Sequence, residues 1–389
     1  MTKPTLASLY SGSGGSAFGF QNAGFEITFM NDKDEDACKT LTKNFKRIIK
    51  PKDIKNISDF GNPNVIEGGF PCQGFSVGRY AKPPKKKENK KYTKIENGKF
   101  LTNDTNNSLY LYLKRAIDKS NPDFFVAENV KGFVHMGEKT KKGPHFKNGK
   151  ISHLGDVAQA IIDDLKLDDR YVVKRELHNA FHFGLPQERE RIIIVGIRKD
   201  IADKFEFKFP EPTHDENNFV SMKKYGVPNF DKKSDKIFRE TKENHDDYFG
   251  SRYMSRNRVR KWSELSHTIP AQANAVPAQP DCKMWDTKDG ERPMKLDKDP
   301  KSETYDELVP YDDADWSEKR KEYEGKISKT LTRLSVKQCA KIQGLPEKWE
   351  FAGELLSRYR QIGNAVPPPM MQKVAECIMA YYKGKKSSY

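Results

Sequence analysis

Cys72 lies in the stretch GGFPCQGFS (68–76), among glycine, proline and small polar residues. A cysteine that only fills space in a core is normally surrounded by large apolar residues. A thiolate is a strong nucleophile, and a thiol in an accessible loop beside backbone amides and cations is easily activated. We therefore expect Cys72 to be an accessible nucleophile rather than a packing residue.

Other side chains that could do chemistry follow apolar runs elsewhere in the chain. Glu128 belongs to ENV (128–130), at the end of the run DFFVAENV. The segment QERER (187–191) precedes another apolar run and includes Gln187, Arg189 and Arg191. Because the carboxyl ends of parallel strands meet at one edge of a sheet, we expect Cys72 and Glu128 to share a cleft there. A nucleophile and an acid in one cleft would support covalent catalysis.

The same edge offers the parts of a nucleoside-binding crevice. The stretch LYSGSGGSAFGF (9–20) predicts a strand, a tight turn at Gly12, Gly14 and Gly15, and a helix. Asp32 ends a second strand, where a carboxylate can accept hydrogen bonds from both hydroxyls of a ribose. Asp53 and Ile54 end a third segment in the same relative place. These residues leave open whether the ligand is a nicotinamide dinucleotide or another adenosine carrier, although no hydride-transfer constellation accompanies them.

The elements that must position these residues alternate along the first half of the chain. Apolar runs predict strands at 5–10, 26–30, 64–69, 123–130, 171–177 and 191–198. Amphipathic stretches between them predict helices at 34–47, 107–119 and 155–166. Alternating strands and helices favour an α/β fold with a doubly wound, mostly parallel sheet covered on both faces.

The pattern changes after about residue 210, where charges, prolines and aromatic residues replace clean periodicity. We therefore predict a first domain over 1–210 and a smaller, irregular second domain over 211–325. A C-terminal segment, 326–389, should return to the first domain, with helices at 335–343 and 367–382. A lysine-rich insertion, 82–99, directly follows the cysteine loop and lacks an apolar stripe.

Composition bounds the partners and the compartment. The formal net charge is +15, which favours a polyanionic partner, although a lysine-rich bias without a partner has the same signature. The five cysteines are scattered singly without a CxxC pair, so we expect neither a metal site nor a disulfide framework. The chain also lacks a signal-like or membrane-spanning apolar run, and we expect a cytoplasmic protein that does not contact membranes.

Taken together, these blocks are similar in order and spacing to the DNA (cytosine-5)-methyltransferase family of the prokaryotic restriction-modification type. The matching blocks are SLYSGSGGSAFGFQNAGF, NDKDEDACKT, GGFPCQGFSVGRY, ENVKGF, LPQERERIIIVGIR, RLSVKQCAKIQGLPEKW and YRQIGNAVPPPM. The resemblance implies a methyltransferase fold that binds S-adenosylmethionine and releases S-adenosylhomocysteine, in a protein of a prokaryote or phage. It also implies that 1–210 is the catalytic, cofactor-binding domain and 211–325 the target-recognition domain. It implies methyl transfer to carbon 5 of a cytosine within a specific sequence of double-stranded DNA, on a base flipped out of the helix.

The resemblance also implies roles for individual residues. Cys72 would bond covalently to carbon 6 of the cytosine, Glu128 would bind the ring nitrogen at position 3, and Arg191 together with Arg189 would hold the base. The implied cofactor-binding residues are Tyr10, Ser11, Gly12, Gly14, Gly15, Ser16, Asp32, Lys33, Asp53, Ile54, Gly69, Pro71, Leu109, Asn364 and Val366. The implied DNA-binding residues are Gln73, Ser76, Arg79, Gln187, Arg256, Arg258, Arg260 and Thr268.

The chain departs from the family pattern at three positions. Family members often begin the first block with an acid where this chain has Ser8, and a large apolar residue usually occupies the position of Ser16. Gln338 replaces a frequent glutamate in the penultimate block.

Two alternatives stay open beside the DNA methyltransferase: a tRNA cytosine-5 methyltransferase and a non-catalytic DNA-binding homologue. The long 211–325 segment disfavours the first, and the presence of Cys72 and Glu128 disfavours the second. For the favoured reading we expect a monomer, with a cognate restriction endonuclease as a possible companion that it need not contact.

Overall fold

The computed structural model describes residues 2–70, 109–135, 154–227, 259–272 and 333–384, together with the short pieces 276–277 and 279–280. It also describes the backbone of three short antiparallel hairpins. These are β4 (Lys94–Glu96) with β5 (Lys99–Leu101), β7 (Phe146–Lys147) with β8 (Lys150–Ile151), and β11 (Met294–Leu296) with β12 (Leu308–Pro310).

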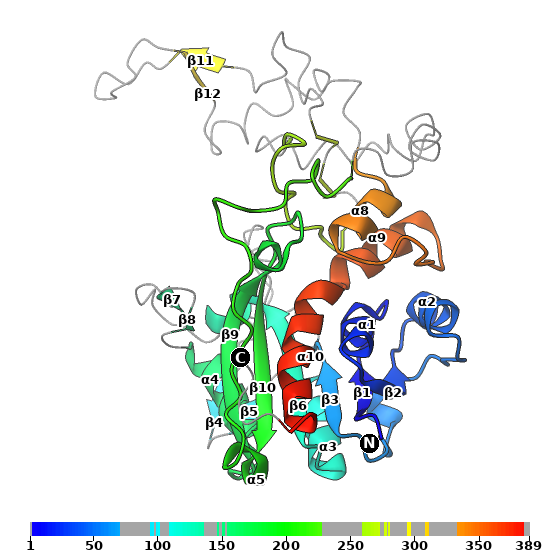
Figure 1. Cartoon of the computed structure of the whole chain (residues 1–389), viewed down its shortest axis with the longest axis vertical. Coiled ribbons are helices and arrows are strands. Elements are labelled where there is room, and N and C mark those ends of the chain that lie inside the picture. Colours follow the sequence, from blue (N-terminus) through cyan, green and yellow to red (C-terminus); the bar gives the residue numbers. More distant parts are fainter. Residues whose placement is uncertain are drawn as a thin grey trace.

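A six-stranded sheet forms the centre of the fold (Figure 1). In spatial order its strands are β2 (Glu26–Asn31), β1 (Thr5–Leu9), β3 (Val65–Gly68), β6 (Phe124–Val130), β10 (Glu190–Arg198) and β9 (Tyr171–Asn179). The first four run parallel, whereas β10 pairs antiparallel with both β6 and β9. The prediction of an α/β fold with a mostly parallel sheet is confirmed.

Burial on both faces explains why these strands read as continuous apolar runs. Every residue of β3 is buried, as are the six residues 192–197 of β10. A strand covered on both sides has no solvent-facing row, so its sequence does not alternate between apolar and polar residues.

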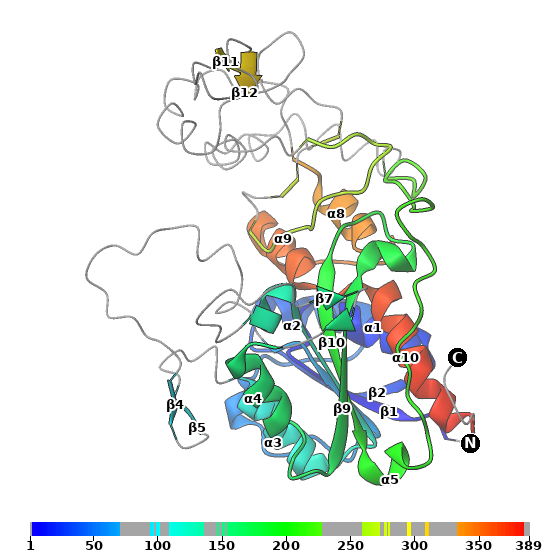
Figure 2. The same cartoon turned by 90° about the vertical axis from the view of Figure 1, so that its left-hand side faces the viewer.

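Helices cover the two faces of the sheet (Figures 1 and 2). On one face α1 (Gly15–Asn22) and α10 (Pro368–Tyr382) pack over one apolar cluster, and α5 (Lys199–Ala202) joins the same cluster. On the other face α3 (Tyr110–Ser120) and α4 (Asp156–Asp164) cover the second cluster. Near β2, α2 (Glu35–Phe45) packs against α1 through a smaller cluster. The chain therefore places residues from both of its ends on the same side of the sheet.

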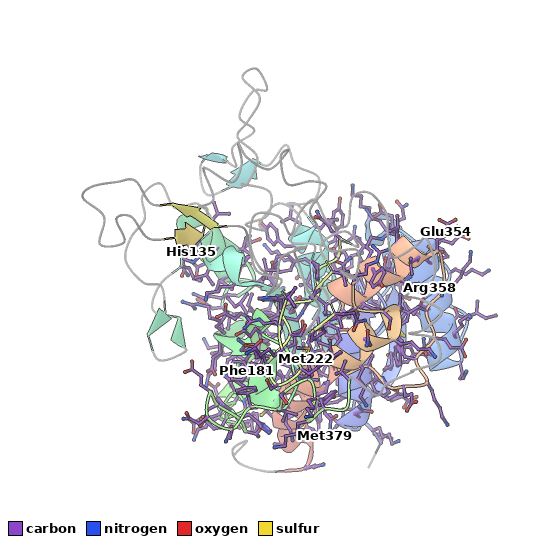
Figure 3. The ribbon with its side chains drawn as sticks, turned by 90° about the horizontal axis from the view of Figure 1, so that it is seen from above. His135, Phe181, Met222, Glu354, Arg358 and Met379 are labelled. Atoms are coloured by element: carbon purple, nitrogen blue, oxygen red, sulfur yellow. The ribbon has the colours of Figure 1, made fainter. Side chains whose placement is uncertain are left out.

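A third apolar cluster lies beyond the sheet, around α8 (Val336–Ile342) and α9 (Leu355–Asn364) (Figure 1). It takes in Met222, Ile269 and Val276 from the region predicted as a second domain. Figure 3 looks onto this layer, with Arg358 of α9 toward one side and Met222 nearer the middle. The helices predicted at 335–343 and 367–382 are present, whereas α9 lay outside the prediction. The division at 210 and 325 stays a prediction.

Short 3-10 turns complete the described elements: η1 (Ile54–Asn56), η3 (Lys131–His135) and η4 (Ala180–Phe183). Among the described residues, no helix is long and apolar enough to cross a membrane.

We predict that Phe124→Ala destabilises the fold by about 3–5 kcal/mol, because it empties a central site between the sheet and α10. Phe124 is 0% exposed, and its ring contacts those of Phe205, Tyr381 and Tyr382. Val172→Ala on β9 is the control, since that side chain is 41% exposed. Urea unfolding of both variants checks the prediction, and equal losses in the two would contradict it.

Candidate active site at the carboxyl edge of the sheet

A cavity of about 450 Å³ opens where the parallel strands β1, β2, β3 and β6 end. Its size suits a ligand of nucleoside dimensions. Its walls come from both ends of the chain. The lining residues are Tyr10, Ser11, Gly12, Gly15, Ser16, Asn31, Asp32, Lys33, Asp34, Asp53, Ile54, Lys55, Glu67, Gly69, Phe70, Leu109, Glu128, Arg360, Asn364, Ala365 and Val366.

The turn after β1 forms one wall and is fixed by hydrogen bonds. Tyr10 adopts a left-handed backbone conformation with φ 52°, and its hydroxyl donates to the carbonyl of Leu109 at 2.7 Å. The amide of Ser11 donates to the carbonyl of Asn31 at 2.9 Å. A non-glycine residue in this conformation is strained and persists only where its surroundings hold it. The turn is therefore set before any ligand arrives.

Gly15 lets the C-terminal segment close over this turn. A Cβ atom built on Gly15 would lie 2.4 Å from the carbonyl oxygen of Val366, closer than any real contact. Only glycine fits such an approach of two backbones. The C-terminal residues Asn364 and Val366 thus reach the cavity because position 15 carries no side chain.

Two carboxyl groups stand at the β2 side of the cavity. Asp32 accepts hydrogen bonds from the amides of Gly12 at 2.8 Å and Asp34 at 2.9 Å, so it ties the turn to the end of β2. Burial raises the pKa of Asp32 above its usual value, and the amide bonds act against this shift. Asp53 caps η1 by accepting from the amide of Lys55 at 2.9 Å, next to the apolar side chain of Ile54.

Of the residues predicted to bind the cofactor, all that the structure describes line this one cavity, except Gly14. Gly14 is the N-cap residue of α1, and its left-handed backbone conformation, with φ 88°, belongs to the turn that leads into this helix. Pro71 lies outside the described residues. The prediction grouped these residues from separate stretches of the sequence, and the fold brings them together.

Glu128 and Arg191 form an ion pair at another side of the cavity. The Nε atom of Arg191 lies 2.7 Å from Oε1 of Glu128, and both side chains are largely buried. The other oxygen of Glu128 lies 3.1 Å from where a Cβ atom on Gly69 would stand, so glycine gives this carboxylate room. The pair is presented by antiparallel neighbours, since Glu128 is on β6 and Arg191 on β10.

The chain that leads to the predicted nucleophile is anchored beside this pair. Asn129 is 1% exposed, and its amide donates to the carbonyl of Phe70 at 3.3 Å. Phe70 is the last described residue before Cys72, which lies outside the described residues. The described chain up to Phe70 is therefore fixed to Asn129, the residue that follows Glu128.

Arg189 occupies a different place from Arg191. It is 1% exposed, and its guanidinium donates to the carbonyls of Ile269 at 3.1 Å, Gly363 at 2.8 Å and Ala365 at 2.9 Å. Arg189 precedes the start of β10, whereas Arg191 belongs to that strand and pairs with Val130 and His178. The structure thus places Arg189 in a buried joint rather than beside Glu128, a correction to the prediction that it holds the base.

Gln187 belongs to the same joint. It is 0% exposed; its amide donates to Oε1 of Gln343 at 2.9 Å, and its own oxygen accepts from the amide of Ile269 at 3.2 Å. A side chain so enclosed cannot contact DNA in this arrangement. The predicted DNA contact of Gln187 is corrected to a structural link between the sheet and α8.

Two predicted DNA-binding residues meet on the surface around Glu188. Arg260 donates to its carboxylate at 2.7 Å, and the hydroxyl of the exposed Thr268 donates to its carbonyl at 2.6 Å. The remaining predicted DNA-binding residues lie outside the described residues: Gln73, Ser76, Arg79, Arg256 and Arg258.

Glu67 is the main residue of the cavity that the prediction missed. It is 3% exposed on β3 and accepts hydrogen bonds from the hydroxyls of Ser8 and, at 2.8 Å, Ser16. Burial and then the charge of Glu128 raise the pKa of Glu67 to about 7, while the two serine bonds act in the opposite direction. The available signal was an acid inside the otherwise apolar run NVIEGG.

Metal ligation has no support in the described part of the chain, where no group of three or more His, Cys, Asp or Glu side chains could hold an ion.

Comparisons with known proteins give a consistent result. The family model for C-5 cytosine-specific DNA methylase matches residues 5–380. Similar curated proteins include the Type II methyltransferase M.BsuRI of Bacillus subtilis, 31% identical over 97% of this chain and 79% of that protein. The Type II methyltransferase M.MthTI of Methanothermobacter thermautotrophicus is 30% identical over 97% of this chain and 98% of that protein.

Solved structures share the fold. The Entamoeba histolytica methyltransferase EhMeth superposes with a TM-score of 0.62 at 15% identity, over 98% of this chain and 99% of that one. A Spodoptera frugiperda DNMT2 mutant superposes with a TM-score of 0.58 at 17% identity, over 97% of this chain and 100% of that one.

We predict that Arg189→Gln lowers the free energy of unfolding by about 3 kcal/mol, because buried carbonyls lose charged donors. Arg358→Gln is the control, since this exposed arginine of α9 donates to one carbonyl, that of Gly353, and its loss should cost less than about 1 kcal/mol. Urea unfolding checks both values. Unchanged stability of Arg189→Gln together with lost methyl transfer would instead favour a direct role at the substrate.

Proposed function

Because the chain belongs to the C-5 cytosine-specific DNA methylase family, we propose that it methylates carbon 5 of a cytosine within a specific duplex DNA sequence, with S-adenosylmethionine as donor. The enzyme class follows from family membership. The observation that carries the finer proposal is the single cavity that joins the glycine turn, the acids after β2 and the Glu128–Arg191 pair.

The residues of the cavity fit an adenosyl ligand. Backbone amides of the turn after β1, the carboxylates of Asp32 and Asp53, and the apolar surface of Ile54 offer what a nucleoside requires. When bound, S-adenosylmethionine supplies an electrophilic methyl group attached to a sulfonium. We assign Asp32, Asp53 and Ile54 to the adenosine end and the residues near Gly69 to the reacting end.

Cys72 is proposed as the nucleophile that makes the cytosine reactive. Carbon 5 of cytosine is a poor nucleophile because the ring is electron-poor. Addition of the Cys72 thiolate to carbon 6 pushes an electron pair into the ring and makes carbon 5 enamine-like, so that it can attack an electrophilic methyl group. After the transfer a base removes the carbon 5 proton, and the thiolate leaves as the double bond re-forms.

Glu128 is proposed to share a proton with the ring nitrogen at position 3, so that the negative charge that this addition creates is neutralised. Its position beside Gly69, one strand from the cysteine loop, allows its carboxyl group to meet the ring nitrogen at position 3 of the base. Arg191 holds that carboxyl group at 2.7 Å and adds positive charge where electron density accumulates. The pair would thus act as one unit.

DNA binding is proposed to involve the basic character of the chain and a flipped base. The net charge of +15 suits a phosphate backbone. A base stacked in a duplex cannot enter a cavity of this kind, so it must swing out of the helix. The names of the relatives support a role in a restriction-modification system, and we propose that the enzyme acts as a monomer, with a companion endonuclease that it need not touch.

We predict that, with S-adenosylmethionine present, a duplex with 5-fluorocytosine at the target position traps the protein covalently, because after methyl transfer a base cannot remove fluorine from carbon 5 as it removes a proton. Bisulfite sequencing of DNA from cells that express the protein first identifies the target sequence. A denaturing gel then shows a retarded protein–DNA band with the wild type and with Cys282→Ser, a control cysteine outside the matched blocks. Cys72→Ser should bind the duplex without forming the band.

A trapped band with Cys72→Ser would overturn the assignment of the nucleophile. The substrate class is checked with tritiated S-adenosylmethionine and equal amounts of duplex DNA and tRNA. We expect label in DNA at least tenfold above tRNA, and the reverse ratio would contradict the DNA assignment.

A further inference from the structure

Glu67 is a buried acid at the cavity wall to which none of the proposed roles above applies. It lies on β3 with 3% exposure and lines the same cavity as the turn after β1. Both of its oxygens are in use: the hydroxyl of Ser8 donates to Oε1, and that of Ser16 donates to Oε2 at 2.8 Å. The carboxyl group is therefore held in one orientation from two other elements, β1 and α1.

The two serines that hold Glu67 come from different elements. Ser8 is on β1 and Ser16 is on α1. In the sheet, Ser8 and Glu67 are direct partners in the parallel pairing of β1 with β3. The strand register and the start of the helix therefore gather one acid and two hydroxyl donors into one cluster.

The charge around Glu67 is unbalanced in the described part of the protein. No described lysine, arginine or histidine forms an ion pair with it, and its donors are neutral hydroxyls. The charged group that acts on it from β6 is Glu128, whose own partner is Arg191. Burial of a carboxylate without a cation lowers the stability of the fold, so we expect Glu67 to have a role other than a purely structural one.

We propose that Glu67, oriented by Ser8 and Ser16, is the counter-charge for a cationic group of S-adenosylmethionine. The inference rests on the proposed function, since it concerns the same cavity. S-Adenosylmethionine has two cationic groups, an ammonium and a sulfonium, and either one meets the chemical requirement.

The proposal has a definite pH signature. With a pKa of about 7, the carboxyl group is mostly protonated at pH 6 and mostly ionised at pH 8. A cation favours the ionised form, so ligand affinity should rise as pH rises through 7, by about tenfold between pH 6 and pH 8. At pH 7 binding should also release about half a proton from this group.

Isothermal titration calorimetry of the full chain with S-adenosylmethionine tests this, at pH 6, 7 and 8 and in two buffers of different ionisation enthalpy. Glu67→Gln keeps the size of the side chain and removes its charge. We expect it to lose about tenfold in affinity at pH 8 and to lose the extra proton release at pH 7. Glu26→Gln, at the exposed start of β2, should behave as the wild type and controls for a change in net charge.

Two further ligands identify the cation. S-Adenosylhomocysteine keeps the ammonium and lacks the sulfonium, whereas 5′-deoxy-5′-dimethylsulfonioadenosine keeps a sulfonium and lacks the ammonium. The ligand whose affinity falls in Glu67→Gln carries the group that Glu67 meets. Equal affinity and equal proton release in wild type and Glu67→Gln for every ligand would overturn the proposal.

The outcomes separate this inference from the proposed function. A wild type that binds none of the adenosyl compounds contradicts the proposed function itself. If Glu67→Gln fails to fold, Ser16→Ala decides, because removal of one donor from the carboxylate should move the midpoint of the pH dependence of affinity upward. An unmoved midpoint in folded Ser16→Ala would count against the proposal.

Discussion

The contact between the turn after β1 and the C-terminal segment is the constraint on which the site depends. The Val366 carbonyl oxygen occupies the space that a side chain at Gly15 would need. Arg189 holds the carbonyls of Gly363 and Ala365 in the same segment, and those bonds are buried. Residues separated by almost the whole chain therefore meet within one backbone contact. The cavity exists only in the folded arrangement that joins the two ends.

This constraint explains why residues of QERER have unequal roles. Arg191 pairs with Glu128, which lines the cavity, whereas Gln187 and Arg189 bind residues of α8 and the C-terminal segment. A short motif can thus contain both an active-site residue and residues that hold the C-terminal segment in place. Substitutions in this motif would alter stability and chemistry through different residues.

The sequence predicted most of the elements because their physical signals are local. Apolar runs marked the six strands of the sheet, and the glycine turn marked the start of α1. The antiparallel direction of β10 could not be predicted, since the sequence of a strand buried on both faces is apolar throughout and does not indicate its direction. Helix α9 was missed because its sequence, LLSRYRQIGN, mixes exposed charges with a terminal glycine and asparagine.

Site residues could be predicted where a sequence motif contains them. They could not be predicted where only the pairing of strands brings them to the site. Asp32, Asp53 and Asn364 came from separate blocks and line one cavity. Glu67 depended on its register opposite Ser8, which no local pattern contains. Arg189 was misplaced because the two arginines of QERER look alike in sequence, and the carbonyls that Arg189 meets belong to distant residues, which no local pattern contains.

The most direct measurement of the central claim is a crystal structure of the protein with S-adenosylhomocysteine. The account predicts the adenosine between the Gly12–Ser16 turn and the side chains of Asp53 and Ile54, and the sulfur toward Gly69 and the side chain of Cys72. A ligand bound elsewhere, or a Cys72 side chain walled off from the cavity, would contradict it.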